Sequence, residues 1–116
     1  MPVVKCVSYN VKGLNSPVKR HKILKELKRL RTDIAFLQET HLSMNSNIRL
    51  YSQDHPTWYY GDTVSKRARG VAIGIAKGTR FKLSSRMTDP EGRFLFLKGR
   101  IEEMEYTLVN LSLIHI

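Results

Sequence analysis

Apolar and polar positions divide the chain into a β-α-β unit followed by a series of strands. Residues 3–8 carry valines near both ends of the stretch and predict a strand. Residues 34–38, IAFLQ, form a short continuous apolar run, which is typical of a strand covered on both faces. Between these strands, apolar residues recur at helical spacing and predict an amphipathic helix from residue 17 to about residue 31. The apolar stripe of this helix consists of Ile23, Leu24, Leu27 and Leu30.

Local signals mark the start of this helix. Ser16 is a favoured capping residue, and it stands directly before Pro17, at the position where a helix accepts proline. Gly13 permits a turn between the first strand and the helix.

Five further strands follow a polar, irregular stretch at residues 43–56, which we interpret as a surface loop. The predicted strands are WYYGD (58–62), GVAIGIA (70–76), FKLSSRM (81–87), RFLFLKGRI (93–101) and EYTLVNL (105–111). Turn signals separate them at residues 65–69, 77–78, 89–92 and 102–105. Gly74, inside one strand, indicates a bulge or a close approach by another group. This order of elements predicts an α/β or α+β sandwich, with β-α-β followed by several mostly antiparallel strands.

Each of the first two predicted strands is followed by a polar residue, Asn10 in one case and Glu39 in the other. A strand, a crossover helix and a second strand of one sheet normally run parallel, so both strands end at the same edge. Ligand sites of α/β sheets favour that edge. An amide oxygen and a carboxylate oxygen suit Mg²⁺, which keeps several waters and takes further oxygens from a substrate phosphate. They suit zinc poorly, because nitrogen and sulfur ligands are lacking.

Simpler interpretations of these residues stay open. A single asparagine and a single glutamate at strand ends are commonly turn-formers or surface residues. His41 is more simply an exposed loop histidine than a metal ligand or a catalytic base.

Length and composition limit the class of protein. The 116 residues leave room for one domain, and a hydrophobic content of 41% is enough for a core. No apolar run approaches the roughly 20 residues that span a bilayer, and nothing resembles a signal peptide, so we expect no membrane association. The single cysteine, Cys6, excludes an internal disulfide and lies in a predicted strand, so we expect a buried, unreactive thiol. We therefore expect a reducing compartment, the nucleus or the cytoplasm.

The charge is more informative than the overall composition. The chain has 20 basic and 10 acidic residues, a net charge of +10. Residues 12–31 hold eight of the bases and one acid, Glu26. A polyanion, most simply nucleic acid, is the natural partner for this segment, and an ordinary solvated helix face is the alternative. The eight bases are Lys12, Lys19, Arg20, Lys22, Lys25, Lys28, Arg29 and Arg31.

Several motifs taken together resemble one family. Asn-x-x-Gly-Leu at residues 10–14, Lys-Arg-His at 19–21 and Gln-Glu-Thr-His at 38–41 carry the match, with support from GVAI at 70–73 and YTLVN at 106–110. They resemble the opening of the endonuclease/exonuclease/phosphatase superfamily. Within it, the chain is most similar to the endonuclease domain at the start of the reverse-transcriptase polyprotein of LINE-type (non-LTR) retrotransposons. The resemblance covers residues 3 to about 111, and the combination of motifs is specific.

This resemblance implies a two-sheet, DNase I-like α/β sandwich that cuts DNA phosphodiester bonds with Mg²⁺, or with Mn²⁺ in its place. It assigns Asn10 and Glu39 to the metal and phosphate site, and hence to catalysis. The bases near the start of the helix are candidates for contacts with DNA phosphates. Arg20 is alternatively a structural residue that pairs with a strand-end carbonyl or an acid. These DNA-binding candidates are Lys12, Lys19, Arg20 and Lys22.

The family's other catalytic residues have no match in this chain. They come from a Tyr-Ala-Pro-Asn segment, an Asp-x-Asn pair and a late Ser-Asp-His run, and Ser112 stands where the tyrosine is expected. A complete domain of this type is also roughly twice as long. We therefore expect residues 1–116 to be a partial, truncated domain that is inactive alone. The ending LSLIHI (111–116) is what a transposase sequencing adapter would encode, so we interpret it as non-native, with a genuine apolar strand as the alternative.

Three functions stay open on these grounds. The leading one is an N-terminal fragment of a Mg²⁺-dependent DNA endonuclease that nicks target sites in retrotransposition. The second is a non-catalytic, basic nucleic-acid-binding fragment. The third is a phosphatase of the same superfamily that acts on soluble phosphates. The sequence carries no signal for an oligomeric state.

Overall fold

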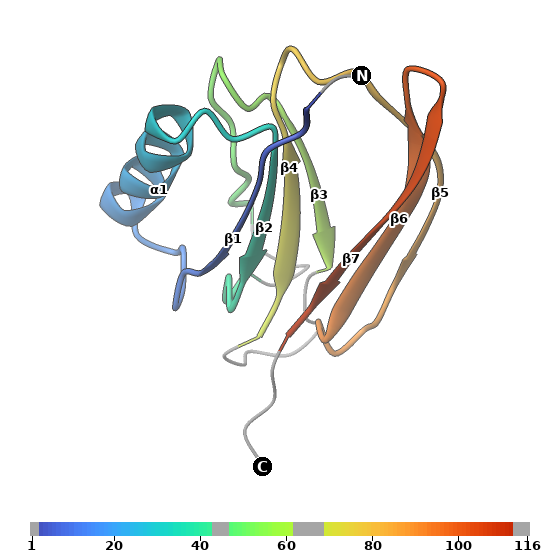
Figure 1. The fold of residues 1–116 in the computed structure, drawn as a ribbon. Helices are drawn as coiled ribbons and strands as arrows, with labels where there is room; N and C mark the ends of the chain where they lie inside the picture. Colours follow the sequence, from blue (N-terminus) through green and yellow to red (C-terminus); the bar gives the residue numbers. More distant parts are fainter. Residues whose placement is uncertain (1–2, 43–46, 62–68, 113–116) are drawn as a thin grey trace.

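Two β-sheets face each other, and helix α1 (Pro17–Arg29) covers the outer face of the first sheet (Figure 1). The computed structural model describes residues 3–42, 47–61 and 69–112. The first sheet has the order β1-β2-β4-β3, in which β1 and β2 are parallel and the other neighbours antiparallel. The second sheet, β5-β6-β7, is antiparallel throughout. The strands are β1 (Cys6–Asn10), β2 (Ile34–Gln38), β3 (Thr57–Gly61), β4 (Val71–Ile75), β5 (Phe81–Thr88), β6 (Phe94–Ile101) and β7 (Met104–Leu111).

The predicted two-sheet α/β sandwich is confirmed, and so are the order and type of its elements. β2 has the predicted bounds, and each of the five later strands lies within two residues of its predicted bounds. The bounds of the first strand were wrong, because β1 begins at Cys6 and includes Asn10. The reason is its register with β2, which starts at the pair Cys6–Ile34. Lys5, just before this pair, instead donates its backbone N–H to the carboxylate of Asp33 at 2.7 Å.

Helix α1 has the predicted cap and the predicted apolar stripe. The Ser16 side chain accepts a hydrogen bond from the backbone N–H of Lys19, and Pro17 opens the helix. Ile23 and Leu27 are its buried residues, and Ile23 packs in one cluster with Leu37 and Ala72 of the first sheet. The helix ends two residues before the predicted end, because Arg31 adopts a left-handed conformation with φ of 54°. No helix among the described residues is long and apolar enough to cross a membrane.

Successive side chains of the central strands point to opposite faces of the first sheet, so they contribute to two hydrophobic cores. Ile34 and Ile73 point toward the second sheet and pack there with Leu95 and Leu97. Leu37 points the other way, into the core beneath α1. Gly74 also lies on that face, and a Cβ atom there would overlap the ring of Trp58, so the predicted close approach is confirmed.

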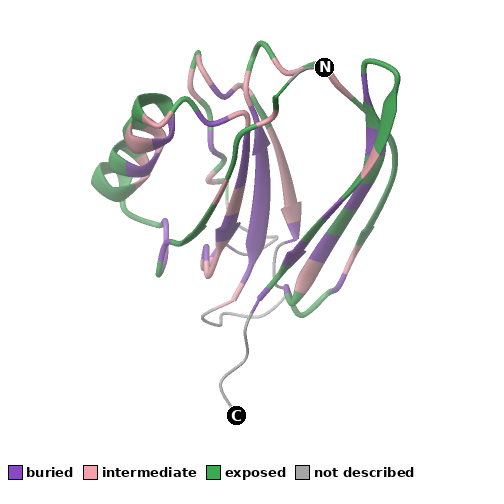
Figure 2. Ribbon diagram, in the orientation of Figure 1, coloured by how far each residue is buried: buried purple, intermediate pink, exposed green. Residues whose placement is uncertain are grey.

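β1 is an edge strand, and this position explains an error about the burial of Cys6 (Figure 2). Cys6 was expected to be buried, but it is exposed, as are four of the five residues of β1. Partial desolvation, and secondarily the carboxylate of Asp33, nevertheless raise the pKa of the Cys6 thiol. A raised pKa disfavours the thiolate, so the expectation of an unreactive thiol is consistent with the structure.

Candidate active site

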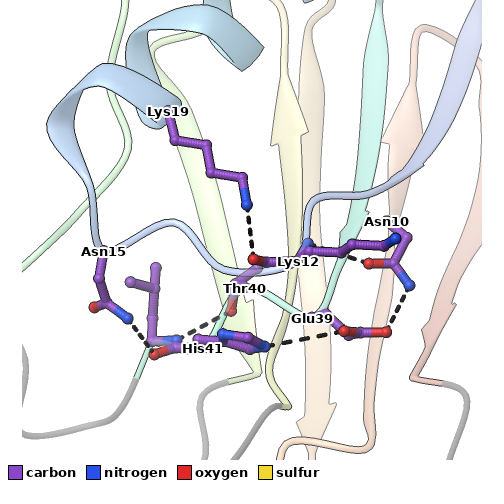
Figure 3. A network of polar contacts seen from close by, with 8 residues as sticks. Asn10, Lys12, Asn15, Lys19, Glu39, Thr40 and His41 are labelled. Carbon is purple, nitrogen blue, oxygen red and sulfur yellow. Dashed lines mark hydrogen bonds and ion pairs between the residues drawn. The ribbon is translucent and has the colours of Figure 1, made fainter.

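The parallel pairing of β1 and β2 places Asn10 beside Glu39 (Figure 3). Asn10 is opposite Gln38 in the register, so Glu39 is the next residue beyond its partner. Asn10 Nδ2 donates a hydrogen bond of 2.6 Å to Glu39 Oε2. The predicted juxtaposition of these two side chains at one edge of the sheet is therefore confirmed.

Backbone pairing continues past the two strands and fixes the segments that carry the site. The N–H of Val11 donates to the carbonyl of Gln38 at 3.0 Å, and the N–H of Gly13 donates to the carbonyl of Glu39 at 2.6 Å. Three non-glycine residues here have positive φ, namely Lys12 at 52°, Glu39 at 55° and His41 at 60°. Such conformations are costly for residues with a Cβ and concentrate at functional sites. This concentration of backbone strain had no signal in the sequence.

The amide of Asn10 is oriented by two neighbours. Its Oδ1 accepts the backbone N–H of Lys12 at 3.1 Å, while its Nδ2 donates to Glu39. The sequence predicts an amide oxygen and a carboxylate oxygen that face a common metal ion. In the structure the amide nitrogen faces the carboxylate, because the amide oxygen is already bonded to Lys12. Asn10 thus donates to the carboxylate of Glu39 while its own oxygen is bonded to the N–H of Lys12. The assignment of Asn10 as a metal ligand stays a prediction.

His41 is not the exposed loop histidine that the sequence predicted. Its side chain is 29% exposed, and its Nε2 lies 3.9 Å from Glu39 Oε1 without a hydrogen-bond partner among the described residues. The ring lies under Gly13, where an added Cβ would come within 2.7 Å of Nδ1. Gly13 therefore serves two purposes, since it has φ of 97° and leaves room for the imidazole.

Gln38 and Asn110 form hydrogen bonds behind the site, a role that the sequence did not indicate for either residue. Gln38 Nε2 donates to Asn110 Oδ1 at 2.8 Å and lies 3.1 Å from Ser8 Oγ. Asn110 is 2% exposed, and its Nδ2 donates to the carbonyls of Leu37 and Ala72 at 3.0 and 2.9 Å. The side chain of Asn110 therefore joins the second sheet to β2 and β4 of the first, next to the end of β2. The sequence did hold one signal for Asn110: it is an asparagine at a position of β7 where the alternation of apolar and polar residues predicts burial.

The basic candidates divide into structural residues and residues that line a cleft. Arg20 Nη1 donates to the carbonyls of Leu14 and Asn15 at 2.8 and 3.0 Å, which favours the structural interpretation of Arg20. Lys19 Nζ donates to the carbonyl of Lys12 at 2.7 Å. A cleft of about 620 Å³ opens between β1 and α1, beside Asn10. Lys12, Lys19 and Lys22 all line this cleft.

The donor set at this edge can be compared with the needs of a metal ion. Glu39 Oε1 accepts no hydrogen bond from the described residues, and the Glu39 side chain is 20% exposed. One carboxylate oxygen, with water and phosphate oxygens completing the shell, fits Mg²⁺ or Mn²⁺. No group of three or more His, Cys, Asp or Glu side chains in the described ranges could hold a metal by itself.

Comparison with known proteins agrees with this fold. The AP endonuclease LMAP of Leishmania major superposes with a TM-score of 0.71 at 20% identity, over 93% of this chain and 39% of that one. Truncated TDP2 of Caenorhabditis elegans gives 0.65 at 22% identity, over 95% of this chain and 46% of that one. TDP2 of D. rerio, complexed with a single strand DNA product, gives a TM-score of 0.62 at 18% identity, over 91% of this chain and 44% of that one. The chain thus spans less than half the length of these solved structures. A model of the Endonuclease/Exonuclease/phosphatase family matches residues 7–107, so the chain belongs to that family.

Proposed function

We propose that this chain is the N-terminal part of a Mg²⁺-dependent endonuclease domain that hydrolyses DNA phosphodiester bonds. Within the family, we assign it to the endonucleases of LINE-type retrotransposons, which nick the target site, and we place it in the nucleus or cytoplasm. The observation that carries the proposal is the contact between Asn10 and Glu39 at the sheet edge, beside a lysine-lined cleft.

The residues at this edge have separate roles in the proposed chemistry. Glu39 would hold the metal through Oε1, and Asn10 keeps that carboxylate in one orientation through its amide N–H. The metal, Mg²⁺ or Mn²⁺, would supply charge stabilisation at a phosphate oxygen. Hydrolysis also needs a base that activates water and a donor for the leaving oxygen. The motifs that provide these groups in the family are absent from residues 1–116, so we infer that this segment is inactive alone.

Two features of the described residues support a partial domain. β1 is an exposed edge strand, and clefts of about 620 and 480 Å³ open on its two sides. Large apolar side chains are also exposed on the outer face of the second sheet, including Met87 at 60% and Val109 at 41%. Surfaces of this kind are normally covered in a stable domain. We propose that further chain, matching the rest of the longer solved structures, covers them.

Residues 111–116 belong to the same proposal. Leu111 ends β7 and Ser112 is buried, whereas residues 113–116 lie outside the described residues. We propose that these six residues are adapter-encoded rather than native. A long read across the source locus tests this, because genomic codons for LSLIHI with other synonymous choices would refute it.

DNA is the proposed substrate, because the lysines beside Asn10 suit phosphate groups. The net charge of +10 and the three lysines of the cleft provide a positive field next to Glu39. TDP2 of D. rerio, one of the similar structures, carries a DNA product. Lys12, Lys19 and Lys22 are the residues that we expect to contact the backbone, and Arg20 supports the loop.

A plasmid-nicking assay tests the proposal. The native reading frame continued beyond Asn110 should nick supercoiled DNA with Mg²⁺, and Glu39→Gln should lower the rate by about a hundredfold or more. Glu105→Gln, an exposed acid on β7, is the matched control and should keep the activity. Nicking by the Glu39→Gln variant at the unmodified rate would refute the assignment of the site.

A non-catalytic nucleic-acid-binding fragment is the second candidate, favoured by the charge alone. Under this alternative, residues 1–116 should bind DNA with a steep salt dependence, and Glu39→Ala should leave the affinity unchanged. A phosphatase acting on soluble phosphates is less favoured, because a basic helix flanking the cleft suits a polyanion better than a small phosphate.

A further inference from the structure

Glu39 lies in a short loop whose backbone is held by a segment remote in the chain. The N–H of Thr40 donates to the carbonyl of Gly70 at 3.1 Å, and the N–H of His41 donates to the carbonyl of Arg69 at 2.8 Å. The two acceptors directly precede β4. The regular pairing of β2 with β4 ends before this loop, so these two hydrogen bonds secure the loop beyond the end of the sheet.

Gly70 occupies a position that has no room for a side chain. It is buried, it has φ of 108°, and a Cβ atom built on it would lie 2.5 Å from Thr40 Oγ1. Thr40 is itself fully buried, so its side chain cannot swing out into water to make room. Any residue with a Cβ at position 70 would therefore displace Thr40, and the adjacent Glu39 with it. The GVAI motif at residues 70–73 begins with this glycine.

The second sheet supports Gly70 in turn. The N–H of Gly70 donates to the carbonyl of Gly92 at 3.2 Å, in the turn between β5 and β6. Asp89 closes that turn, since its Oδ2 accepts the backbone N–H of Arg93 at 3.2 Å and the Arg93 Nε at 2.6 Å. Gly70 therefore connects a closed turn of the second sheet to the loop that carries Glu39.

We propose that Gly70 is a positioning residue for the carboxylate of Glu39, an inference that rests on the proposed metal site. Gly70 acts through the backbone of Thr40 and His41 and itself contacts neither the metal nor DNA. Glu39 Oε2 accepts from Asn10 at 2.6 Å, so displacement of the loop changes the direction in which Oε1 points. Groups that orient a metal ligand typically contribute tenfold to a hundredfold to metal affinity.

Electron paramagnetic resonance detects free Mn²⁺ and so measures metal binding without DNA and without catalysis. The protein is the domain that continues natively beyond Asn110, and Glu39→Gln identifies which bound ions belong to this site. In that domain, Gly70→Ala should weaken Mn²⁺ binding by about tenfold. Ile101→Val is the control for lost stability, because Ile101 belongs to the core and lines a cavity with Asp33, at the far end of β2 from Glu39. This control should lower Tm and leave the Mn²⁺ dissociation constant unchanged.

Thr40→Ala provides the rescue experiment. It removes the Oγ1 atom that an alanine Cβ at position 70 would meet. The double variant Gly70→Ala/Thr40→Ala should therefore bind Mn²⁺ within about threefold of Thr40→Ala, the remainder reflecting the strain of a Cβ at positive φ. An unchanged dissociation constant in folded Gly70→Ala, or a double variant that binds as weakly as Gly70→Ala, would overturn the proposal.

Circular dichroism establishes which variants fold. If Gly70→Ala does not fold, the double variant is compared with Thr40→Ala in its place, and equal dissociation constants for these two proteins would overturn the proposal. Failure of the proposed function has a separate signature, in which the unmodified domain binds no Mn²⁺ that Glu39→Gln removes. In that case the metal site is refuted, and the role of Gly70 is refuted with it.

Discussion

Removal of the Asn110 side chain should destabilise the domain more than any exposed substitution on the same strand. Asn110→Ala deletes two hydrogen bonds to the carbonyls of Leu37 and Ala72 and one from Gln38. The site is 2% exposed, so water cannot readily replace these bonds. At about 1 kcal/mol for each net hydrogen bond, the free energy of unfolding should fall by about 3 kcal/mol.

Thermal unfolding followed by circular dichroism measures this effect in the domain that continues natively beyond Asn110. For a domain of that size, about 3 kcal/mol corresponds to a fall in Tm of roughly 6–12 °C. Thr107→Ala, which is exposed on β7, is the control and should change the free energy by less than about 0.5 kcal/mol. If Asn110→Ala and Thr107→Ala destabilise equally, the bonds between the sheets do not contribute as the geometry indicates.

Three further predictions follow from the fold. Ser16→Ala removes the acceptor for the Lys19 N–H and should lower the free energy of unfolding by about 0.5–1 kcal/mol. The effect is at the low end for a cap because the hydrogen bond is long, at 3.4 Å. Urea denaturation measures the change, and an unchanged midpoint would contradict the role of Ser16 as a cap. The Arg93 guanidinium bonds to Asp89 and lowers the pKa of that carboxyl. The pair therefore stabilises the fold at pH values above the unfolded-state pKa of about 3.9. This stabilisation is lost as the pH falls through the lower folded-state pKa. This acid-induced loss of stability should be absent from Asp89→Asn. Identical acid unfolding curves for Asp89→Asn and the unmodified protein would count against the prediction. Residues 1–116 alone, with their exposed sheet edges, should show broad thermal unfolding and poorly dispersed amide spectra, whereas a sharp cooperative transition would contradict the partial domain.

Elements with strong local signals were predictable from the sequence. The cap at Ser16, the stripe of α1 and the continuous apolar run of β2 lie close to their predicted positions, because neighbouring residues determine each of them. The exposure of Cys6 was not predictable in the same way. Burial of a strand depends on what lies beside it, and β1 is at the edge of its sheet.

The candidate site was predictable in its members and not in its geometry. Asn10 and Glu39 could be paired from the sequence, because a parallel β-α-β unit places its strand ends at one edge. The orientation of the Asn10 amide could not, since it depends on the backbone N–H of Lys12 in a left-handed turn. The role of Asn110 depends on contact with residues more than 70 positions away along the chain, which no local pattern records.

The sequence by itself determined the elements, their order, the edge of the sheet at which the polar residues gather and the family resemblance. These properties follow from periodicity, capping and charge, which act over a few residues. Only the tertiary structure decided that Asn10 donates to Glu39, that His41 lies under Gly13, and that Asn110 donates to the carbonyls of Leu37 and Ala72. Each of these depends on distances of a few ångströms between segments that are remote in the chain, and such distances are set by packing of the whole domain.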